Sequence, residues 1–131
     1  MVTKIRTFKD LEVWKKAFIL AIDIIRLTEK LPKGMSTKII SEQLIRASTS
    51  ISSNIAEGFG SFSRKEFGRY LKIALKSSYE TDNWLMLLQE SISPDHRTVR
   101  NDISGLQELN VEITKMLLVL HRKVESSLKG N

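Results

Sequence analysis

Residues 48–70 read STSISSNIAEGFGSFSRKEFGRY, and this stretch decides how the chain is organised. Its first half holds four serines within six positions, interleaved with apolar residues such as Ile51 and Ile55. Serine is a mediocre helix former, so this density indicates a role in packing rather than in helix propensity. Small side chains on a helix also let the backbone of a neighbouring helix come close. We therefore expect a tightly packed helix of a helical bundle here.

The second half of the stretch predicts a turn and a new helix. Gly58 and Gly60 are expected to end the first helix, because glycine adopts a left-handed C-cap without strain. Ser63 and Glu66 then fit the Ser-x-x-Glu capping box that begins a helix. The stretch predicts two helices joined by a short glycine turn, and nothing in this pattern names an activity.

Length and composition favour a single globular domain over residues 1–131. The chain has the usual size of one domain, and its two prolines and six glycines are few enough to favour helices over strands. A net charge of +6 raises the expectation of an acidic partner, nucleic acid above all. On charge alone, a basic solvated surface is an equal alternative.

Hydrophobic periodicity extends the helical prediction to the whole chain. We expect helices over Thr7–Leu31, Thr37–Phe59 and Ser63–Ser91, and a fourth helix that begins at Ser93-Pro94. Four amphipathic helices with short links predict an all-α fold, an antiparallel up-down-up-down four-helix bundle. The apolar stripes and seams expected along the helices are, helix by helix, Leu11, Trp14, Phe18, Ile22 and Ile25, widened by Ile24, Leu27 and Leu31; then Ile40, Leu44, Ala47, Ile51 and Ile55; then Phe67, Leu71, Ala74, Ser78, Thr81, Leu85 and Leu88; and finally Ile103, Leu106, Asn110, Ile113, Leu117, Leu120 and Val124. Spacing leaves open which seam faces the core and which faces a partner subunit.

The sequence offers few groups for enzymatic chemistry. Without cysteine, the chain has no disulfide, no thiolate metal site and no cysteine nucleophile. The two histidines, His96 and His121, lack the Glu-x-x-His pattern of a di-iron bundle, and no Gly-x-Ser-x-Gly elbow is present. Gly58-Phe59-Gly60 matches only the start of a phosphate-binding loop. We therefore predict a protein that is not an enzyme and uses no metal or cofactor.

No stretch is expected to enter a membrane. Residues 17–27 are apolar, but they are too short to cross a bilayer and are interrupted by Asp23 and Arg26. The N-terminus lacks the uninterrupted apolar core of a signal peptide. These observations predict a cytoplasmic protein.

A row of cations is the strongest functional signal among the residues. Five cations share residues 63–76 with a single acid, Glu66, and these cations are Arg64, Lys65, Arg69, Lys72 and Lys76. The last four recur at helical spacing and so share one helix face, with Arg64 beside the start of their row. Such a row suits a phosphate backbone, which is bound mostly without sequence preference. A merely solvated face is the alternative. A second basic cluster near the N-terminus comprises Lys4, Arg6, Lys9, Lys15 and Lys16.

Several segments carry a family resemblance. The most specific is Ser50–Gly58, SISSNIAEG, which is followed by SRKEF at residues 63–67. Further matching segments are Phe8–Ala17, Gln43–Ser48, Tyr70–Ala74 and Lys115–Leu117. These segments resemble the four-helix-bundle family of proteins encoded in the intervening sequences of bacterial 23S ribosomal RNA genes, also labelled as S23 ribosomal protein.

The resemblance implies a bundle that assembles as a homopentamer. It also implies similarity to the accessory variability protein of diversity-generating retroelements, a basic pentameric barrel that binds nucleic acid and a reverse transcriptase. No catalytic residue is carried over. Arg46, Asn54, Glu57 and Gly58 match the family's motif positions, for which the resemblance implies helix packing or subunit contact.

Two hypotheses about function follow. The first is a non-enzymatic homo-oligomeric bundle, a pentamer by its resemblance, that binds RNA or DNA through the basic row. The second is a protein-interaction scaffold without direct nucleic-acid binding, in which residues outside the helix seams, such as Trp84 and Met116, contact a partner protein.

Overall fold

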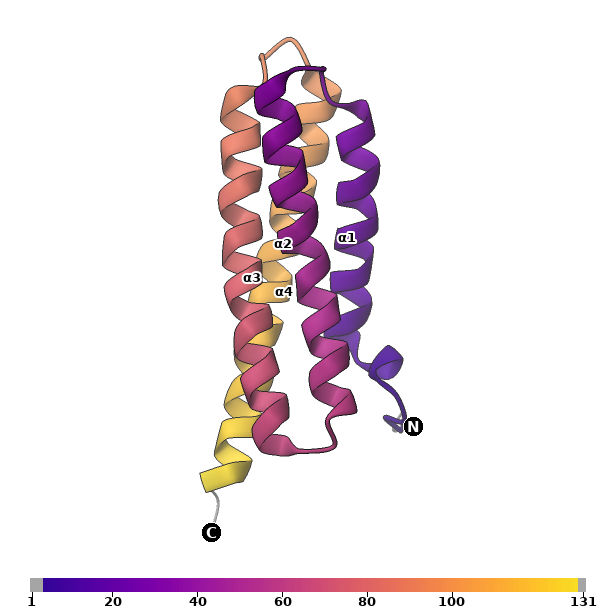
Figure 1. The fold of residues 1–131 in the computed structure, drawn as a ribbon, viewed down its shortest axis with the longest axis vertical. Helices are drawn as coiled ribbons and strands as arrows, with labels where there is room; N and C mark the ends of the chain where they lie inside the picture. The colour runs from indigo at the N-terminus through magenta and orange to yellow at the C-terminus, as the bar shows by residue number, and fades with distance from the viewer. Residues whose placement is uncertain (1–3, 130–131) are drawn as a thin grey trace.

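The fold is a bundle of four long helices. The computed structural model describes residues 4–129. A single turn of 3-10 helix, η1 (Phe8–Asp10), precedes α1 (Glu12–Lys30), α2 (Met35–Gly60), α3 (Arg64–Ser91) and α4 (Arg97–Lys129). Each long helix runs antiparallel to the next, and both ends of the chain lie at the lower end of the bundle in Figure 1. Contacts join α1 to α2, α2 to α3, α3 to α4, and α4 back to α1. The predicted all-α, up-down-up-down four-helix bundle is confirmed.

The seams of α2, α3 and α4 all face the core of the bundle, which settles a choice that their spacing left open. Their side chains meet in one hydrophobic cluster whose largest fully buried members include Leu44, Leu71, Leu85 and Ile113. Ile40, Phe67 and Leu120 lie at the edge of this cluster and are partly buried. The spacing of apolar residues therefore grouped the side chains of each seam correctly, and the structure adds that each seam faces the core.

The prediction for α1 is correct for Ile24, Leu27 and Leu31, which are buried, but wrong for Phe18 and Ile25. The structure buries Val13, Ala17, Leu20, Ala21, Ile24 and Leu27. Phe18 is 46% exposed and Ile25 is 36% exposed, while Trp14 is half-buried and stacks on the Phe18 ring with 5.0 Å between ring centroids. The apolar side of this helix is broad, so periodicity alone admits two faces. The face with two alanines is the one that the neighbouring helices cover.

The start of α3 agrees with the sequence prediction, and the starts of the first and fourth helices differ from it. Thr7 and Asp10 form a reciprocal capping box, but this box caps η1, because Leu11 is extended and α1 begins at Glu12. The Ser63 hydroxyl accepts a hydrogen bond from the Glu66 amide at 3.2 Å and caps α3. The fourth helix does not begin at Ser93-Pro94; these residues form a turn before α4 begins at Arg97.

The glycines of the central stretch do not act as left-handed caps. Gly58 and Gly60 both lie inside α2, and no glycine of residues 4–129 has a left-handed backbone. Gly58 is buried, and a Cβ added there would lie 2.6 Å from the Cβ of Tyr70 on α3. This glycine is therefore required by the close approach of two helices rather than by a turn.

Small polar residues line the contact between α2 and α3, which is the most extensive in the bundle. Ser48 and Ser77 are buried, and the Ser77 hydroxyl donates to the Ser50 hydroxyl across the interface at 3.0 Å. The expectation that the serine-rich segment is closely packed is confirmed. Within residues 4–129, no helix is long and apolar enough to cross a membrane.

Candidate nucleic-acid interface

The predicted basic row lies on the outer face of α3. Arg64, Lys65, Arg69, Lys72 and Lys76 are all exposed, and none of them points into the bundle core. Their helical spacing places the last four along one side of the first half of the helix. The structure thus provides an accessible line of cations.

Only one cation of this row forms an ion pair within the described part of the chain. The Arg69 guanidinium lies 2.9 Å from a Glu66 carboxylate oxygen, and it also lies over the Tyr70 ring, 4.6 Å from the ring centroid. This hydrogen bond from Arg69 lowers the pKa of Glu66, which therefore stays ionised at neutral pH. The remaining four cations have no acidic partner among residues 4–129 and are available to an external anion.

A shallow hollow of about 290 Å³ separates this row from α4. It is lined on α3 by Lys65, Arg69 and Lys72, and on α4 by His121 and Glu125. His121 Nε2 lies 3.6 Å from a Glu125 carboxylate oxygen, so these two form a side-chain contact at the bundle surface. One carboxylate therefore borders the row on the α4 side.

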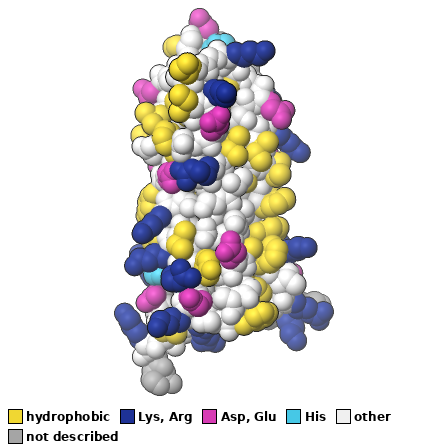
Figure 2. Space-filling model, viewed as in Figure 1, with side chains coloured by type: hydrophobic (Ala, Val, Ile, Leu, Met, Phe, Trp, Pro, Cys, Tyr) yellow, Lys and Arg dark blue, Asp and Glu magenta, His cyan; other side chains and the backbone are white. Residues whose placement is uncertain are grey.

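Positive charge is concentrated at one end of the bundle. Residues 4–21, 48–77 and 112–129 make up the lower half in Figure 1. They carry fourteen of the 21 Lys and Arg residues but only six of the 15 Asp and Glu residues. Figure 2 shows this gathering of Lys and Arg side chains around the lower part of the molecule. The opposite half has more acids than cations, so the bundle is electrically polar along its axis.

The N-terminal basic cluster lies at the same end of the bundle as the α3 row. Alternation of direction puts the starts of α1 and α3 at this end, although these two helices are not in contact. Arg6 of the cluster and Arg64 of the row line one hollow. Lys15 pairs with Glu12 at 3.2 Å and Lys16 pairs with Glu112 of α4 at 2.9 Å. The cluster is therefore partly neutralised, unlike most of the α3 row.

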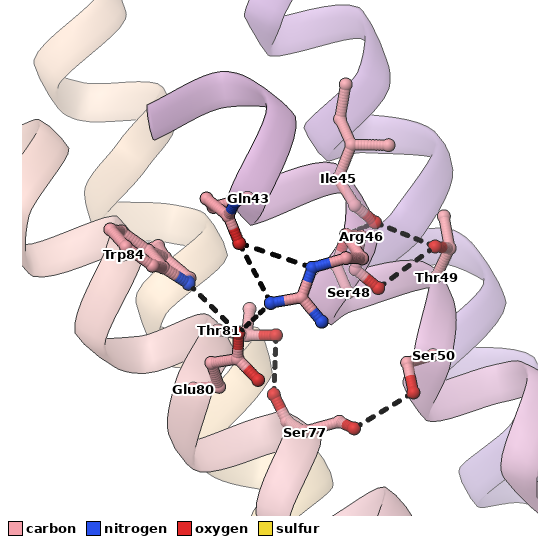
Figure 3. Close-up of polar contacts among 10 residues, drawn as sticks. All are labelled: Gln43, Ile45, Arg46, Ser48, Thr49, Ser50, Ser77, Glu80, Thr81 and Trp84. Carbon is pink, nitrogen blue, oxygen red and sulfur yellow. Dashed lines mark hydrogen bonds and ion pairs between the residues drawn. The ribbon is translucent and has the colours of Figure 1, made fainter. Parts of the chain in front are cut away.

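Among the family-motif residues, Arg46 ties α2 to α3. Its guanidinium donates to Gln43 at 2.8 Å and pairs with the Glu80 carboxylate, and the Trp84 indole N–H donates to the same carboxylate at 3.3 Å. Figure 3 shows this cluster beside the Ser50–Ser77 contact. Arg46 is exposed, so this hydrogen-bonded cluster lies at the outer edge of the contact between α2 and α3.

The other motif residues have separate local roles. The Asn54 amide donates to the Ser50 carbonyl at 2.8 Å, and Ser53 donates to the Glu57 carboxylate at 3.3 Å, so both stay within α2. Gly58 is covered by Tyr70. The four motif residues therefore form no single site; two face α3 and two brace their own helix.

The structure makes one exposed aromatic residue conspicuous that the sequence patterns did not single out. Phe62 lies in the turn between α2 and α3, and 94% of it is exposed. Phe62 has a φ of 54°, and it is the one non-glycine residue of the described chain with a left-handed backbone. In the sequence, the only sign that Phe62 is unusual is that this apolar residue lies outside every helical stripe. Among the same described residues, no three His, Asp or Glu side chains come together as a metal site would require.

Comparison with protein families identifies the chain. A family model described as 23S rRNA-intervening sequence protein matches residues 9–118. The chain belongs to this family. The match includes the whole of α1, α2 and α3, and so the motif residues and the basic row of this family member.

A solved structure from the same group has the same fold. It is a protein with unknown function from the S23 ribosomal protein family of Bacteroides thetaiotaomicron. It is 31% identical to this 23S rRNA-intervening sequence protein, with a TM-score of 0.71, over 83% of this chain and 97% of the other. No functionally curated protein matches the chain.

Proposed function

We propose that this protein is a non-enzymatic, homo-oligomeric, cytoplasmic bundle that binds RNA or DNA through the outer face of α3. The observation that carries the proposal is the exposed row of Arg64, Lys65, Arg69, Lys72 and Lys76, in which only Arg69 has an acidic partner within residues 4–129. The polar distribution of charge supports it, because a phosphate backbone is drawn to the end where cations outnumber acids.

Contacts of this kind bind the nucleic-acid backbone rather than a sequence. Lysine and arginine on phosphates fix position and release counterions, and the bases themselves are not read. The proposal therefore includes affinity for many sequences and a steep dependence on salt.

The oligomeric part of the proposal is supported by the outer surface of α1. Phe18, Ile19 and Ile25 are between 36% and 51% exposed on this helix. A helix that keeps large apolar residues outside its own core is suited to a second protein surface. The family resemblance suggests five subunits.

Nucleic-acid affinity measured across a salt series tests the proposal. For wild type we expect log affinity to fall linearly with log salt, with a slope of about −0.9 per phosphate neutralised on duplex DNA. The double variant Arg69→Glu/Lys72→Glu should bind roughly tenfold or more weakly at low salt, with a shallower slope. Lys33→Glu/Lys38→Glu is the matched control, since both lysines are exposed near the opposite end. If the first pair binds as wild type does, the row is not the interface.

The second candidate function is a protein-interaction scaffold, and a separate apolar surface on α3 supports it. Trp84 and Met116 pack against the core and are partly buried, but Tyr79, Met86 and Leu87 on α3 are about half exposed. A partner protein could cover these three. Recovery of one stoichiometric protein from nuclease-treated lysate, lost on Met86→Lys, would favour this candidate.

A further inference from the structure

Phe62 combines two unfavourable features at one position. Its left-handed backbone strains any residue with a Cβ, and its ring is 94% exposed to water. A strained, exposed aromatic side chain contributes little to the fold, and such outliers concentrate where a ligand is bound. These two features suggest that the Phe62 ring contacts a ligand.

The surroundings of Phe62 indicate the chemistry of that partner. Phe62 lines an open hollow of about 390 Å³ together with two cations, Arg6 from the N-terminal segment and Arg64 from the start of α3. The same hollow includes Phe59 and Phe67, whose rings meet edge to face at 6.2 Å between centroids. Aromatic faces beside arginines match a ligand that is flat and apolar in one part and anionic in the next.

The turn holds Phe62 in place before any ligand arrives. The Ser61 amide donates to the Gly58 carbonyl at 3.2 Å, and the Ser61 hydroxyl donates to the same carbonyl at 2.6 Å. On the other side, Ser63 is fixed as the cap of α3. With both neighbours anchored, the backbone of the turn is already ordered, so less backbone entropy is lost on binding.

We propose that Phe62 is a base-stacking residue and that the ligand of this end of the bundle is single-stranded nucleic acid. One unpaired base lies on the Phe62 ring, Arg6 and Arg64 hold the adjoining phosphates, and the strand continues along the α3 row. This inference rests on the proposed function and narrows it. Bases in a duplex are already stacked on one another, so a protruding ring reaches a base face only in a single strand.

Comparing single-stranded and duplex affinity tests the inference. The probes are a 20-nucleotide uridine or thymidine strand and a duplex of the same length, titrated against full-length protein by fluorescence anisotropy. Phe62→Ala should weaken binding of the single strand by about 5- to 150-fold, the range that stacking of one base supplies. Its duplex affinity and its salt slope should match wild type. Phe62→Trp should restore single-strand binding, because it replaces one stacking ring with another.

Controls separate this inference from the proposal that it narrows. Met35→Ala, an exposed apolar truncation near the opposite end, should leave both affinities unchanged. If Phe62→Ala binds the single strand normally while Arg69→Glu/Lys72→Glu does not, the stacking inference is wrong and the basic interface stands. If neither changes binding, both fail. If Phe62→Ala changes the mass of the assembly, the ring is a subunit contact and the stacking inference is overturned.

Discussion

Gly58 shows at the scale of one residue how the tightest helix contact is made. An added Cβ would lie 2.6 Å from the Cβ of Tyr70 and 3.0 Å from the Phe67 ring, so α2 and α3 would have to separate. We expect Gly58→Ala to lower the free energy of unfolding by about 1–3 kcal/mol, as overpacking does. Urea denaturation measures the change.

Gly60→Ala is the matched control for this prediction. It lies in the same helix two residues later, and no atom lies within 4 Å of its added Cβ. Alanine there should be neutral or stabilising, by up to about 1 kcal/mol of helix propensity. Equal unfolding midpoints for the two variants would contradict the close-contact explanation of Gly58.

The sequence predicted that Gly58 was special but attributed it to the wrong property. Glycine lacks a Cβ, and that one fact permits both a left-handed turn and a close approach of another helix. Local sequence favoured the turn. The close approach depends on Tyr70, and no local pattern reveals that contact. The left-handed residue proved to be Phe62, which sequence propensity disfavours.

At the scale of the element, an acid on α3 neutralises part of the basic row. Glu66 is the one acid among the cations at the start of this helix, and it engages Arg69. We expect Glu66→Gln to free Arg69, to raise nucleic-acid affinity and to steepen the salt slope by about one phosphate, or about −0.9. Anisotropy titrations across a salt series measure both quantities.

Acid should reproduce this effect only at low pH. The hydrogen bond from Arg69 lowers the pKa of Glu66, so the carboxylate stays ionised through the usual titration range of glutamate and is protonated only below it.

The Glu66→Gln variant keeps the helix cap, because Ser63 accepts its hydrogen bond from the backbone amide of residue 66. Affinity that is unchanged, or lower, in Glu66→Gln would mean that Arg69 does not contact the ligand.

Helix prediction succeeded or failed according to how many sides of an element are apolar. In α3 and α4 spacing defined a seam, and the structure turns that seam towards the core. In α1 the sequence favoured the stripe through Trp14 and Phe18, whereas the bundle buries the side with Ala17, Leu20 and Ile24. The choice between two apolar sides is made by the neighbouring helices, and hydrophobicity along one helix does not contain it.

The whole molecule should assemble through the apolar outer surface of α1. We expect wild type to be a homo-oligomer, a pentamer by the family resemblance, and Phe18→Lys to shift it towards monomer by placing a charge in the contact. Native mass spectrometry and light scattering measure the mass. Met35→Lys is the control, because Met35 is 80% exposed but lies at the start of α2, away from that surface. If Phe18→Lys has the same mass as wild type, the subunits do not contact one another through this surface of α1.

The candidate interface could be predicted only in part at this scale. Spacing alone identified the row on α3, because helical geometry fixes which residues share a face. That the N-terminal cluster lies at the same end as this row follows from the topology and could have been deduced from the parallel directions of α1 and α3. The partial neutralisation of that cluster by Glu12 and Glu112 depends on side-chain geometry, which no spacing rule supplies.

The unequal sharing of charge along the bundle would give the proposed assembly and the proposed ligand binding opposite responses to salt. In a ring of parallel subunits every basic end would face the same rim, and those ends would repel one another at low ionic strength. Added salt would then tighten the ring while loosening its hold on a polyanion. A nucleic-acid strand bound around that rim would act as a counterion shared by all subunits. By neutralising the repulsion between the basic ends, it would stabilise the ring.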